Sequence, residues 1–385
     1  MANRIVPPLF DLQVNGYGGV WFTSESLDAV AIRRVAMAMA TQGVARFCPT
    51  LTTASPECTI RALRTLAVVC AENDVACDEP LRGPMDGAQI VGIHMEGPYI
   101  SPEDGPRGAH PQAWCRPPER DEFLRFQEAA DGRIRIVTLS PEYDGAATFV
   151  EWLTVAGIRV AIGHTAATPE QIRAAVDAGA TFSTHLGNGS HAQLPRLENY
   201  LWAQLADDRL DATLIADGFH LPDDPLSVFL HCKGPERACL VSDMAGVAGL
   251  SPGVYESALC RCELLEEGRL VVAGQREFLA GAARPLVDGV VHLVRRLGWT
   301  LEDAWRLASI RPMEIFYGDR PASGEMAMDG CSPTNESFPK SGVSASAETG
   351  SFCRIRTTEP PDSFDIEILE TVLHGRVLYR KTLES

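Results

Sequence analysis

One carboxylate and two imidazoles are the side chains of this chain best suited to hold a metal ion together. We assign Glu96, His164 and His185 as ligands, because this donor set suits Zn²⁺ or a similar divalent cation. A catalytic site of this kind keeps one coordination position open for water. Each residue alone is a weak signal, since a single His after a strand is more often a hydrogen-bonded core residue and a single Glu is often a helix cap. The assignment therefore depends on the elements that position the three side chains.

Short apolar runs alternate along the chain with amphipathic, helix-like segments. The expected strands are residues 9–14, 44–48, 90–95, 134–139, 158–162, 181–184, 212–216 and 239–242. The helix-like segments include residues 27–41, 56–72, 146–156, 169–178, 285–297 and 301–309. This alternation implies a parallel sheet with helical crossovers, and eight such units favour a closed (β/α)₈ barrel of the TIM type. A Gly-x-Gly-x-x-Gly turn does not follow the first strand, which argues against a dinucleotide-binding fold.

The reactive residues of a (β/α)₈ barrel lie at the carboxyl ends of its strands. Glu96 follows the third expected strand, His164 follows the fifth and His185 follows the sixth. His220 comes after the seventh strand and Asp243 comes after the eighth. These side chains are therefore expected to converge at one mouth of the barrel, an arrangement much harder to obtain by chance than any one residue alone.

The chain divides into three parts. The barrel is expected to span residues 7–318. Residues 319–350 are rich in Gly, Ser, Ala, Glu and Pro, and we predict that they form a flexible insertion. Residues 351–385 regain strand-like alternation at 366–373 and 376–379, and we expect them to form a small accessory β-segment.

Composition and charge exclude several kinds of partner. The chain has 34 Lys and Arg against 51 Asp and Glu, a formal net charge of −17, which argues against binding to nucleic acid or to an anionic membrane. An anionic substrate would need positive charge at its own site. No apolar stretch reaches the roughly 18 residues of a membrane helix, and no signal-peptide run opens the chain. The 11 scattered cysteines are typical of reduced thiols, so we expect a cytoplasmic protein.

Several motifs, in order along the chain, resemble those of the N-acetylglucosamine-6-phosphate deacetylases of the amidohydrolase superfamily. They are GIHMEGPY at 92–99, GAHP at 108–111, IGHT at 162–165, AGAT at 178–181, THL at 184–186, IADGFH at 215–220, VSD at 241–243 and LAG at 279–281. The resemblance runs from about residue 10 to about residue 312, and only the motifs together are specific. It implies a barrel of the metal-dependent hydrolase type and hydrolysis of N-acetylglucosamine 6-phosphate to glucosamine 6-phosphate and acetate.

The resemblance also assigns roles to residues near the expected metal. Asp243 would act as general base on a metal-activated water and then as general acid on the amine, which leaves poorly unless it is protonated. A capping or salt-bridged Asp is the alternative. His110 and His220 would orient the sugar or stabilise the oxyanion, and a structural histidine is the alternative at both positions.

The end of the first strand decides how many metal ions are expected. Many amidohydrolases have His-x-His there, whereas this chain has Gln13 and Asn15. Neutral amides are poor ligands for a transition metal, and a Gln-x-Asn version resembles the deacetylases that use a single metal. We therefore predict one divalent ion, Zn²⁺ first, with Fe²⁺, Co²⁺ or Mn²⁺ as alternatives. Gln13 and Asn15 would form hydrogen bonds in the site or would only hold the loop.

Contacts to an amino-sugar substrate also follow from the resemblance. The family binds its sugar phosphate with backbone N–H groups after the sixth strand and with an Arg that often comes from a neighbouring subunit, so a homodimer is expected. At Arg196 the alternative is an exposed arginine without a role. At Leu279, the first residue of the LAG motif, the alternative is a plain core leucine. The residues expected to contact the sugar are Ala109, His110, Asn188, Gly189, Arg196, His220, Leu279, Ala280 and Gly281.

The chain departs from the family pattern at three places. Gly187 stands where the family usually has an aromatic residue, and Gly189 stands where it usually has Ala, although the backbone donors of Asn188 and Gly189 are expected to remain available. The first barrel strand begins almost at once, so half of the companion β-domain is expected to be missing. The insertion interrupts the tail, which leaves a reduced accessory β-region formed mainly by the C-terminal tail.

Two other functions stay open on the sequence alone. The substrate of such a hydrolase could be another N-acyl sugar or N-acyl amine that lacks the phosphate. The barrel could also be a catalytically silent binding protein, although retention of all three expected ligands together with Asp243 argues against silence.

Overall fold

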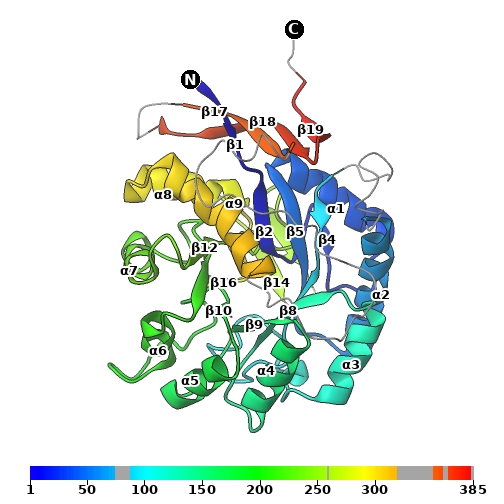
Figure 1. Cartoon of the computed structure of the whole chain (residues 1–385), viewed down its shortest axis with the longest axis vertical. Helices are drawn as coiled ribbons and strands as arrows, with labels where there is room; N and C mark the ends of the chain where they lie inside the picture. The colour runs from blue at the N-terminus through cyan, green and yellow to red at the C-terminus, as the bar shows by residue number, and fades with distance from the viewer. Residues whose placement is uncertain (74–86, 258–259, 319–349, 359–362, 383–385) are drawn as a thin grey trace.

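Eight parallel strands wrapped by helices form the body of the protein (Figure 1). The computed structural model describes residues 1–73, 87–257, 260–318, 350–358 and 363–382. The flexible insertion predicted for residues 319–350 lies outside the described residues, apart from Gly350. None of the helices described combines the length and the hydrophobicity needed to span a lipid bilayer. The nine cysteines described are free thiols.

The barrel strands follow one another in chain order around the ring. They are β2 (Leu9–Val14), β5 (Val44–Leu51), β7 (Ile93–Glu96), β8 (Ile134–Leu139), β9 (Arg159–Ile162), β10 (Phe182–Ser183), β11 (Asp211–Leu214) and β12 (Ala238–Leu240). Each pair of neighbours is parallel. A bridge between Val14 and Met244 joins the last strand region to the first. The predicted (β/α)₈ barrel is thus confirmed, with strand ends shifted by a few residues. The short β6 (Gln89–Ile90) also pairs with β5.

Helices cover the outside of the barrel. They are α1 (Ala29–Thr41), α2 (Pro56–Asn73), α3 (Arg120–Ala129), α4 (Ala146–Val155), α5 (Pro169–Asp177), α6 (Tyr200–Ala206), α7 (Asp223–Lys233), α8 (Leu286–Leu297) and α9 (Leu301–Tyr317), with a short 3₁₀ turn η1 (Gln112–Trp114). Helix α9 runs past residue 309, where the sequence suggested an end, and includes Pro312. It continues because Ile315 and Phe316 are buried, with the Phe316 ring 5.5 Å from that of Phe10.

The interior of the barrel is apolar at the end where the strands begin, which we call the closed end, and polar at the carboxyl ends of the strands. One cluster brings together side chains from most of the strands with the end of α9: Phe10, Leu12, Cys48, Ile136, Ala161, Phe182, Ile215, Cys239, Val241, Ile315 and Phe316. These residues exclude water from the barrel and leave only the carboxyl ends of the strands for a site.

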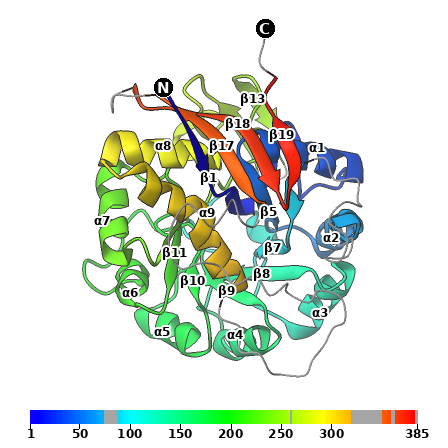
Figure 2. The ribbon, with the colours of Figure 1, turned by 45° about the horizontal axis from the view of Figure 1, so that its top comes forward.

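A four-stranded antiparallel sheet lies beside α1 at the closed end of the barrel (Figure 2). Its order is β1 (Ala2–Val6), β17 (Phe352–Thr357), β18 (Ile366–Leu373) and β19 (Arg376–Arg380). Three of the strands come from the C-terminal tail, as expected for the accessory region. Strand β1 was not predicted, because its three central residues are exposed and give no alternating pattern.

A second antiparallel unit between β12 and α8 was also not predicted. It consists of β13 (Gly253–Glu256), β14 (Arg261–Leu264), β15 (Leu270–Val272) and β16 (Gln275–Leu279). A small cluster of Ala245, Val247, Leu264, Leu270 and Ala280 joins it to the loop after β12. Trp21 of the hairpin formed by β3 (Gly16–Tyr17) and β4 (Val20–Trp21) packs against this cluster, so the unit supports one side of the barrel mouth.

Candidate active site

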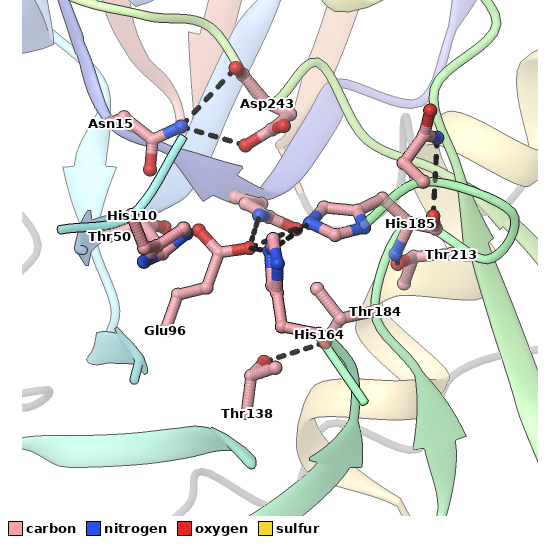
Figure 3. A network of polar contacts seen from close by, with 12 residues as sticks. Asn15, Thr50, Glu96, His110, Thr138, His164, Thr184, His185, Thr213 and Asp243 are labelled. Carbon is pink, nitrogen blue, oxygen red and sulfur yellow. Dashed lines mark hydrogen bonds and ion pairs between the residues drawn. The ribbon is translucent and has the colours of Figure 1, made fainter. Parts of the chain in front are cut away.

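Three buried side chains meet at the mouth of the barrel (Figure 3). Glu96 ends β7, and His164 and His185 follow β9 and β10. Glu96 Oε1 lies 3.2 Å from His164 Nε2 and 2.7 Å from His185 Nε2, and the two Nε2 atoms are 3.1 Å apart. Among the residues described, this is the one group of His, Cys, Asp and Glu whose ligand atoms gather closely enough for a metal ion. We call Glu96, His164 and His185 the tripod.

The tripod fits a divalent cation by donor type and by spacing. Ligands at about 2.05 Å from a tetrahedral ion are about 3.3 Å apart, and the three observed separations lie near that value. The hydrogen bond from His164 Nδ1 to the Pro106 carbonyl oxygen, at 2.8 Å, fixes the tautomer that leaves the His164 Nε2 lone pair free to ligate.

Backbone strain gathers at the same strand ends. His164, His185 and Asp243 all have positive φ, at 49°, 29° and 53°, which costs a non-glycine residue about 1 to 3 kcal/mol each. The His185 N–H donates to Thr213 Oγ1 at 2.7 Å and helps to hold its turn. Strain at adjacent positions is typical of sites where the fold fixes side chains for function.

Two loops close over His164. A Cβ on Gly189, in the loop after β10, would lie 2.6 Å from His164 Nδ1 and 3.0 Å from the Pro106 oxygen. The loop after β7 supplies Pro106, and a Cβ on its Gly105 would lie 2.9 Å from the Cα of His191. The Gly at position 189 is therefore explained in this chain by the close packing of the two loops on a tripod residue.

Gly189→Ala is accordingly expected to weaken metal binding by about 10- to 100-fold, because the new methyl group displaces His164 from Pro106. Gly145→Ala is the matched control: Gly145 also has positive φ, at 78°, but a Cβ there meets no atom within 4 Å. Titration of both metal-free variants with Co²⁺ checks the prediction. Equal affinity in the two variants would show that the glycine serves backbone conformation alone.

Gln13 and Asn15 both make hydrogen bonds at the tripod. Gln13 Nε2 donates to Glu96 Oε1 at 2.8 Å, so the amide holds the carboxylate. Asn15 Nδ2 donates to Asp243 Oδ1 at 2.7 Å and to the Asp243 carbonyl oxygen at 3.3 Å. Both amides are buried, and the structure gives them partners in the site rather than a role in the loop alone.

Asp243 stands beside the tripod with one carboxylate oxygen engaged. Figure 3 shows it with Asn15 on one side of the three ligands. Its N–H donates to the Gln13 carbonyl oxygen at 3.0 Å. Burial, and then the nearby charge of Glu96, raise the pKa of Asp243 to about 6. Because Asn15 occupies Oδ1, Oδ2 is the oxygen left to exchange a proton.

His110 and His220 lie at the same mouth, with their tautomers set by neighbours. Thr53 contacts His110 Nδ1 through its N–H at 3.3 Å and its hydroxyl at 2.9 Å, so the proton of His110 is on Nε2. The His110 and His164 ring centroids are 4.4 Å apart, and burial lowers the pKa of His110 to about 3. His220 Nδ1 donates to Asp217 Oδ2 at 2.8 Å. Both imidazoles keep Nε2 for a further partner.

The loop after β10 departs from expectation at Asn188. Its N–H and its Nδ2 both donate to the His185 carbonyl oxygen, at 3.0 and 3.2 Å, so the prediction that this backbone donor remains available is wrong. The chain turns tightly after His185, and the turn uses the donor. The Gly189 N–H bonds to no other residue that the structure describes. Arg196 is exposed and forms no ion pair within the described part of the chain.

The remaining expected sugar contacts lie close to the tripod loops or to the β13–β16 unit. Ala109 is half-buried directly before His110. The Ala280 N–H donates to the Leu270 carbonyl oxygen at 3.1 Å, and Gly281 has a φ of 120°, where an added Cβ would lie 3.3 Å from the Cβ of Ala245. Leu279 is half-buried at the end of β16. Their roles toward a sugar stay predictions.

Sequence reasoning missed the groups that orient the candidate residues. Asp217 accepts hydrogen bonds from the N–H groups of Phe219 and His220 as well as from the His220 ring, at 2.8 and 2.9 Å for the two N–H groups. Its spacing of three residues before His220 was an available signal. The Pro106 carbonyl and the Thr213 hydroxyl gave no such signal, because any residue offers a carbonyl and threonines are common in strands.

Metal binding is expected to weaken as the pH falls from 7 to 5. Burial by itself lowers the pKa of His185, but hydrogen bonding to Glu96 outweighs it and raises the pKa above the usual value. A ligating imidazole must be neutral, so protons compete with the cation and affinity should fall about tenfold per pH unit for each proton released. Calorimetry with Zn²⁺ in buffers of different ionisation enthalpy measures that release. Affinity that is constant from pH 5 to 7 contradicts the expectation.

Comparison with known proteins gives relatives along most of the chain. The sequence is 33% identical over 318 residues to an N-acetylgalactosamine-6-phosphate deacetylase of Escherichia coli O157:H7, covering 83% of this chain and 79% of the relative. It is also 33% identical over 327 residues to the N-acetylglucosamine-6-phosphate deacetylase of Mus musculus, covering 82% and 75%. The N-acetyl-D-glucosamine-6-phosphate deacetylase structure of Mycobacterium smegmatis matches with a TM-score of 0.78 at 27% identity, covering 98% and 88%. No family model matches the sequence.

Proposed function

Because this chain belongs to the N-acetylglucosamine-6-phosphate deacetylase family of the amidohydrolase superfamily, we propose that it hydrolyses the N-acetyl amide of an amino-sugar phosphate. The first candidate is N-acetylglucosamine 6-phosphate, which would give glucosamine 6-phosphate and acetate. The observation that carries the proposal is the buried tripod of Glu96, His164 and His185 with the carboxylate of Asp243 beside it. These four groups supply what hydrolysis of an unactivated amide needs.

The tripod residues would hold one divalent ion, with Zn²⁺ as our first choice and Fe²⁺, Co²⁺ or Mn²⁺ as alternatives. When bound, such an ion lowers the pKa of a water molecule towards roughly 7 and polarises the amide carbonyl. Gln13 holds the carboxylate of Glu96 and, as a neutral amide, offers no strong ligand for a second ion. This supports the prediction of a single metal.

Asp243 would move the protons of the reaction. With Oδ1 held by Asn15, its Oδ2 takes a proton from the attacking water and returns it to the nitrogen of the breaking amide bond. Its burial keeps water from competing for that proton. His110 can donate from Nε2 to a sugar or carbonyl oxygen, since Thr53 fixes its tautomer. His220, oriented by Asp217, offers a second contact.

The phosphate would bind away from the tripod, beyond the loop after β10. The Gly189 N–H is one backbone donor of that loop that has no partner among the residues described. Arg196 follows in the same exposed stretch, and a guanidinium is suited to a phosphate. The proposal that Arg196 reaches the site of a second subunit, and with it a homodimer, stays a prediction from the sequence, as does a cytoplasmic location.

Two other arginines that the structure describes near the mouth are each close to an acidic side chain. Arg107 faces Asp104, and Arg284 lies 3.8 Å from Asp288. The overall charge of −17 repels anions in general, so productive binding of a phosphate depends on local donors such as the Gly189 N–H and the Arg196 guanidinium.

Kinetics on paired substrates test the function. We expect acetate release from N-acetylglucosamine 6-phosphate with a kcat/KM at least about 100-fold above that for unphosphorylated N-acetylglucosamine, since a charge-assisted phosphate contact contributes several kcal/mol. N-acetylgalactosamine 6-phosphate is the second candidate, because one 33% identical relative bears that activity in its name. Comparable rates with and without the phosphate would favour another N-acyl substrate. No hydrolysis of any N-acetyl sugar by the metal-loaded protein would favour a silent barrel.

A further inference from the structure

A buried layer of three polar side chains lies inside the barrel next to the tripod, and the proposed mechanism uses none of them. His94 is on β7, Thr138 is on β8 and Thr184 follows β10, and at most 3% of each is exposed. We call these three residues the His94 layer. Figure 3 shows the Thr138–Thr184 contact beside His164.

One chain of hydrogen bonds runs through the His94 layer in a single direction. His94 Nδ1 lies 3.2 Å from the Leu12 carbonyl oxygen, which can only accept, so the ring proton is on Nδ1. His94 Nε2 must then accept from the Thr138 hydroxyl at 2.7 Å. The Thr138 oxygen in turn accepts from the Thr184 hydroxyl at 2.6 Å. Each donor and acceptor of the chain has one complementary partner.

Each of the three ligands has a member of the His94 layer close to it, either along the backbone or packed against the residue that precedes it. His94 precedes Glu96 by two residues on β7, so both side chains face the barrel interior. Thr184 is joined by a peptide bond to His185. Gly163, which precedes His164, is enclosed by the layer: a Cβ there would lie 2.8 Å from Thr138 Cγ2 and 2.9 Å from Thr184 Cβ.

We propose that the His94 layer positions the tripod, by holding the strand ends that carry Glu96, His164 and His185 at a spacing suited to a divalent cation. The three residues act through the ligands and do not touch the substrate. The inference rests on the proposed function only in that the tripod holds a metal ion.

The polar character of the layer supports a positioning role over space filling. The barrel below it is packed with apolar side chains, and valine would fill the space of either threonine. A buried imidazole and hydroxyl are costly unless all their hydrogen bonds are made, so a fully satisfied chain favours one arrangement of the strand ends. Loss of one hydroxyl is expected to loosen that arrangement without leaving a cavity.

Thr138→Val tests the inference, because it removes the hydroxyl that links His94 to Thr184 and keeps the side-chain shape. Thr138→Ser keeps the hydroxyl and serves as the rescue variant. Thr371→Val is the matched control, since Thr371 is fully buried in the accessory sheet and donates to the Ala40 carbonyl oxygen at 2.8 Å. Each protein is stripped of metal and titrated with Co²⁺, and the visible absorption of the bound Co²⁺ is recorded.

We expect Thr138→Val to raise the Kd for Co²⁺ by about 10- to 100-fold and to change the Co²⁺ spectrum, as for other groups that orient metal ligands. Thr138→Ser and Thr371→Val should stay within about threefold of the unmodified protein and keep its spectrum. Thr184→Val breaks the same chain from its other end and should reproduce the Thr138→Val result, which guards against a folding defect in one variant.

An unchanged Kd and an unchanged spectrum in folded Thr138→Val and Thr184→Val would overturn the inference. A metal affinity reduced equally by Thr371→Val would also overturn it, since the loss would then reflect stability alone. The readout is separate from the proposed reaction: an unmodified protein that binds Co²⁺ but releases no acetate would refute the function and still test the layer. An unmodified protein that binds no metal would refute both.

Discussion

Asp243→Asn is expected to lower kcat by about 10³- to 10⁴-fold while the protein keeps one metal ion per chain. An amide cannot take a proton from water at neutral pH or return one to the departing amine. Its oxygen can still accept the hydrogen bond from Asn15 that Asp243 Oδ1 accepts at 2.7 Å, so the local geometry should survive. Metal content is measured on the purified protein, and acetate release is measured at saturating substrate.

Asp211→Asn is the control for that experiment. Asp211 is a partly buried carboxylate on β11 that pairs with Arg311 at 2.8 Å, at the end of the strand far from the mouth. Its replacement should lower thermal stability and leave kcat within about twofold. A kcat for Asp243→Asn close to that of the unmodified protein would remove Asp243 from the acid–base role, and loss of the metal in that variant would make it a ligand.

His185→Ala is expected to abolish both metal binding and activity. The side chain lies 2.7 Å from Glu96 Oε1 and 3.1 Å from His164 Nε2, and two ligands alone hold a cation weakly. We expect the Kd for Zn²⁺ to rise by more than about 100-fold, beyond the loss typical of groups that merely orient ligands, and acetate release to fall below 1% of the normal rate. His164→Ala should behave in the same way.

The metal titration separates ligand loss from general damage. His231→Ala provides the comparison, because His231 is an exposed histidine on α7 with a hydrogen bond to the Ser227 carbonyl oxygen. That variant should bind Zn²⁺ with unchanged affinity. If His185→Ala retained one tightly bound ion and full activity, the tripod would not be the metal site.

The barrel was predictable because its strands are buried on both faces and read as continuous apolar runs. Strand β8 (Ile134–Leu139) and strand β2 (Leu9–Val14) match the predicted bounds, and helix α5 begins at Pro169 as predicted. The candidate ligands were predictable for a related reason. The carboxyl ends of all the strands in this fold surround the same mouth, so polar residues at those ends lie near one another.

The parts of the structure that were not predicted depend on contacts, chiefly of the backbone, that do not require a particular type of side chain. Strand β1 is recognised only through its antiparallel pairing with β17, and its exposed centre gives no pattern. The four short strands from Gly253 to Leu279 lack the long apolar runs of the barrel. The tautomer of His164 depends on the backbone oxygen of Pro106, which any residue would offer.

The loop after β10 shows the same limit at a residue predicted to contact the substrate. Asn188 matched the family motif, but its N–H is used within the turn that follows His185. The sequence shows which residue stands there, whereas the φ of 95° at Gly187 and of 56° at Gly189 decides where its donors point.

A stoichiometric titration of the metal-free protein tests the central claim most directly. Zn²⁺ is added in steps to a known amount of protein, and acetate release from N-acetylglucosamine 6-phosphate is measured at each step. Activity should rise in proportion to the metal and level off at one ion per chain. Undiminished acetate release by the metal-free protein, or a plateau reached only at two ions per chain, would contradict a single cation held by Glu96, His164 and His185.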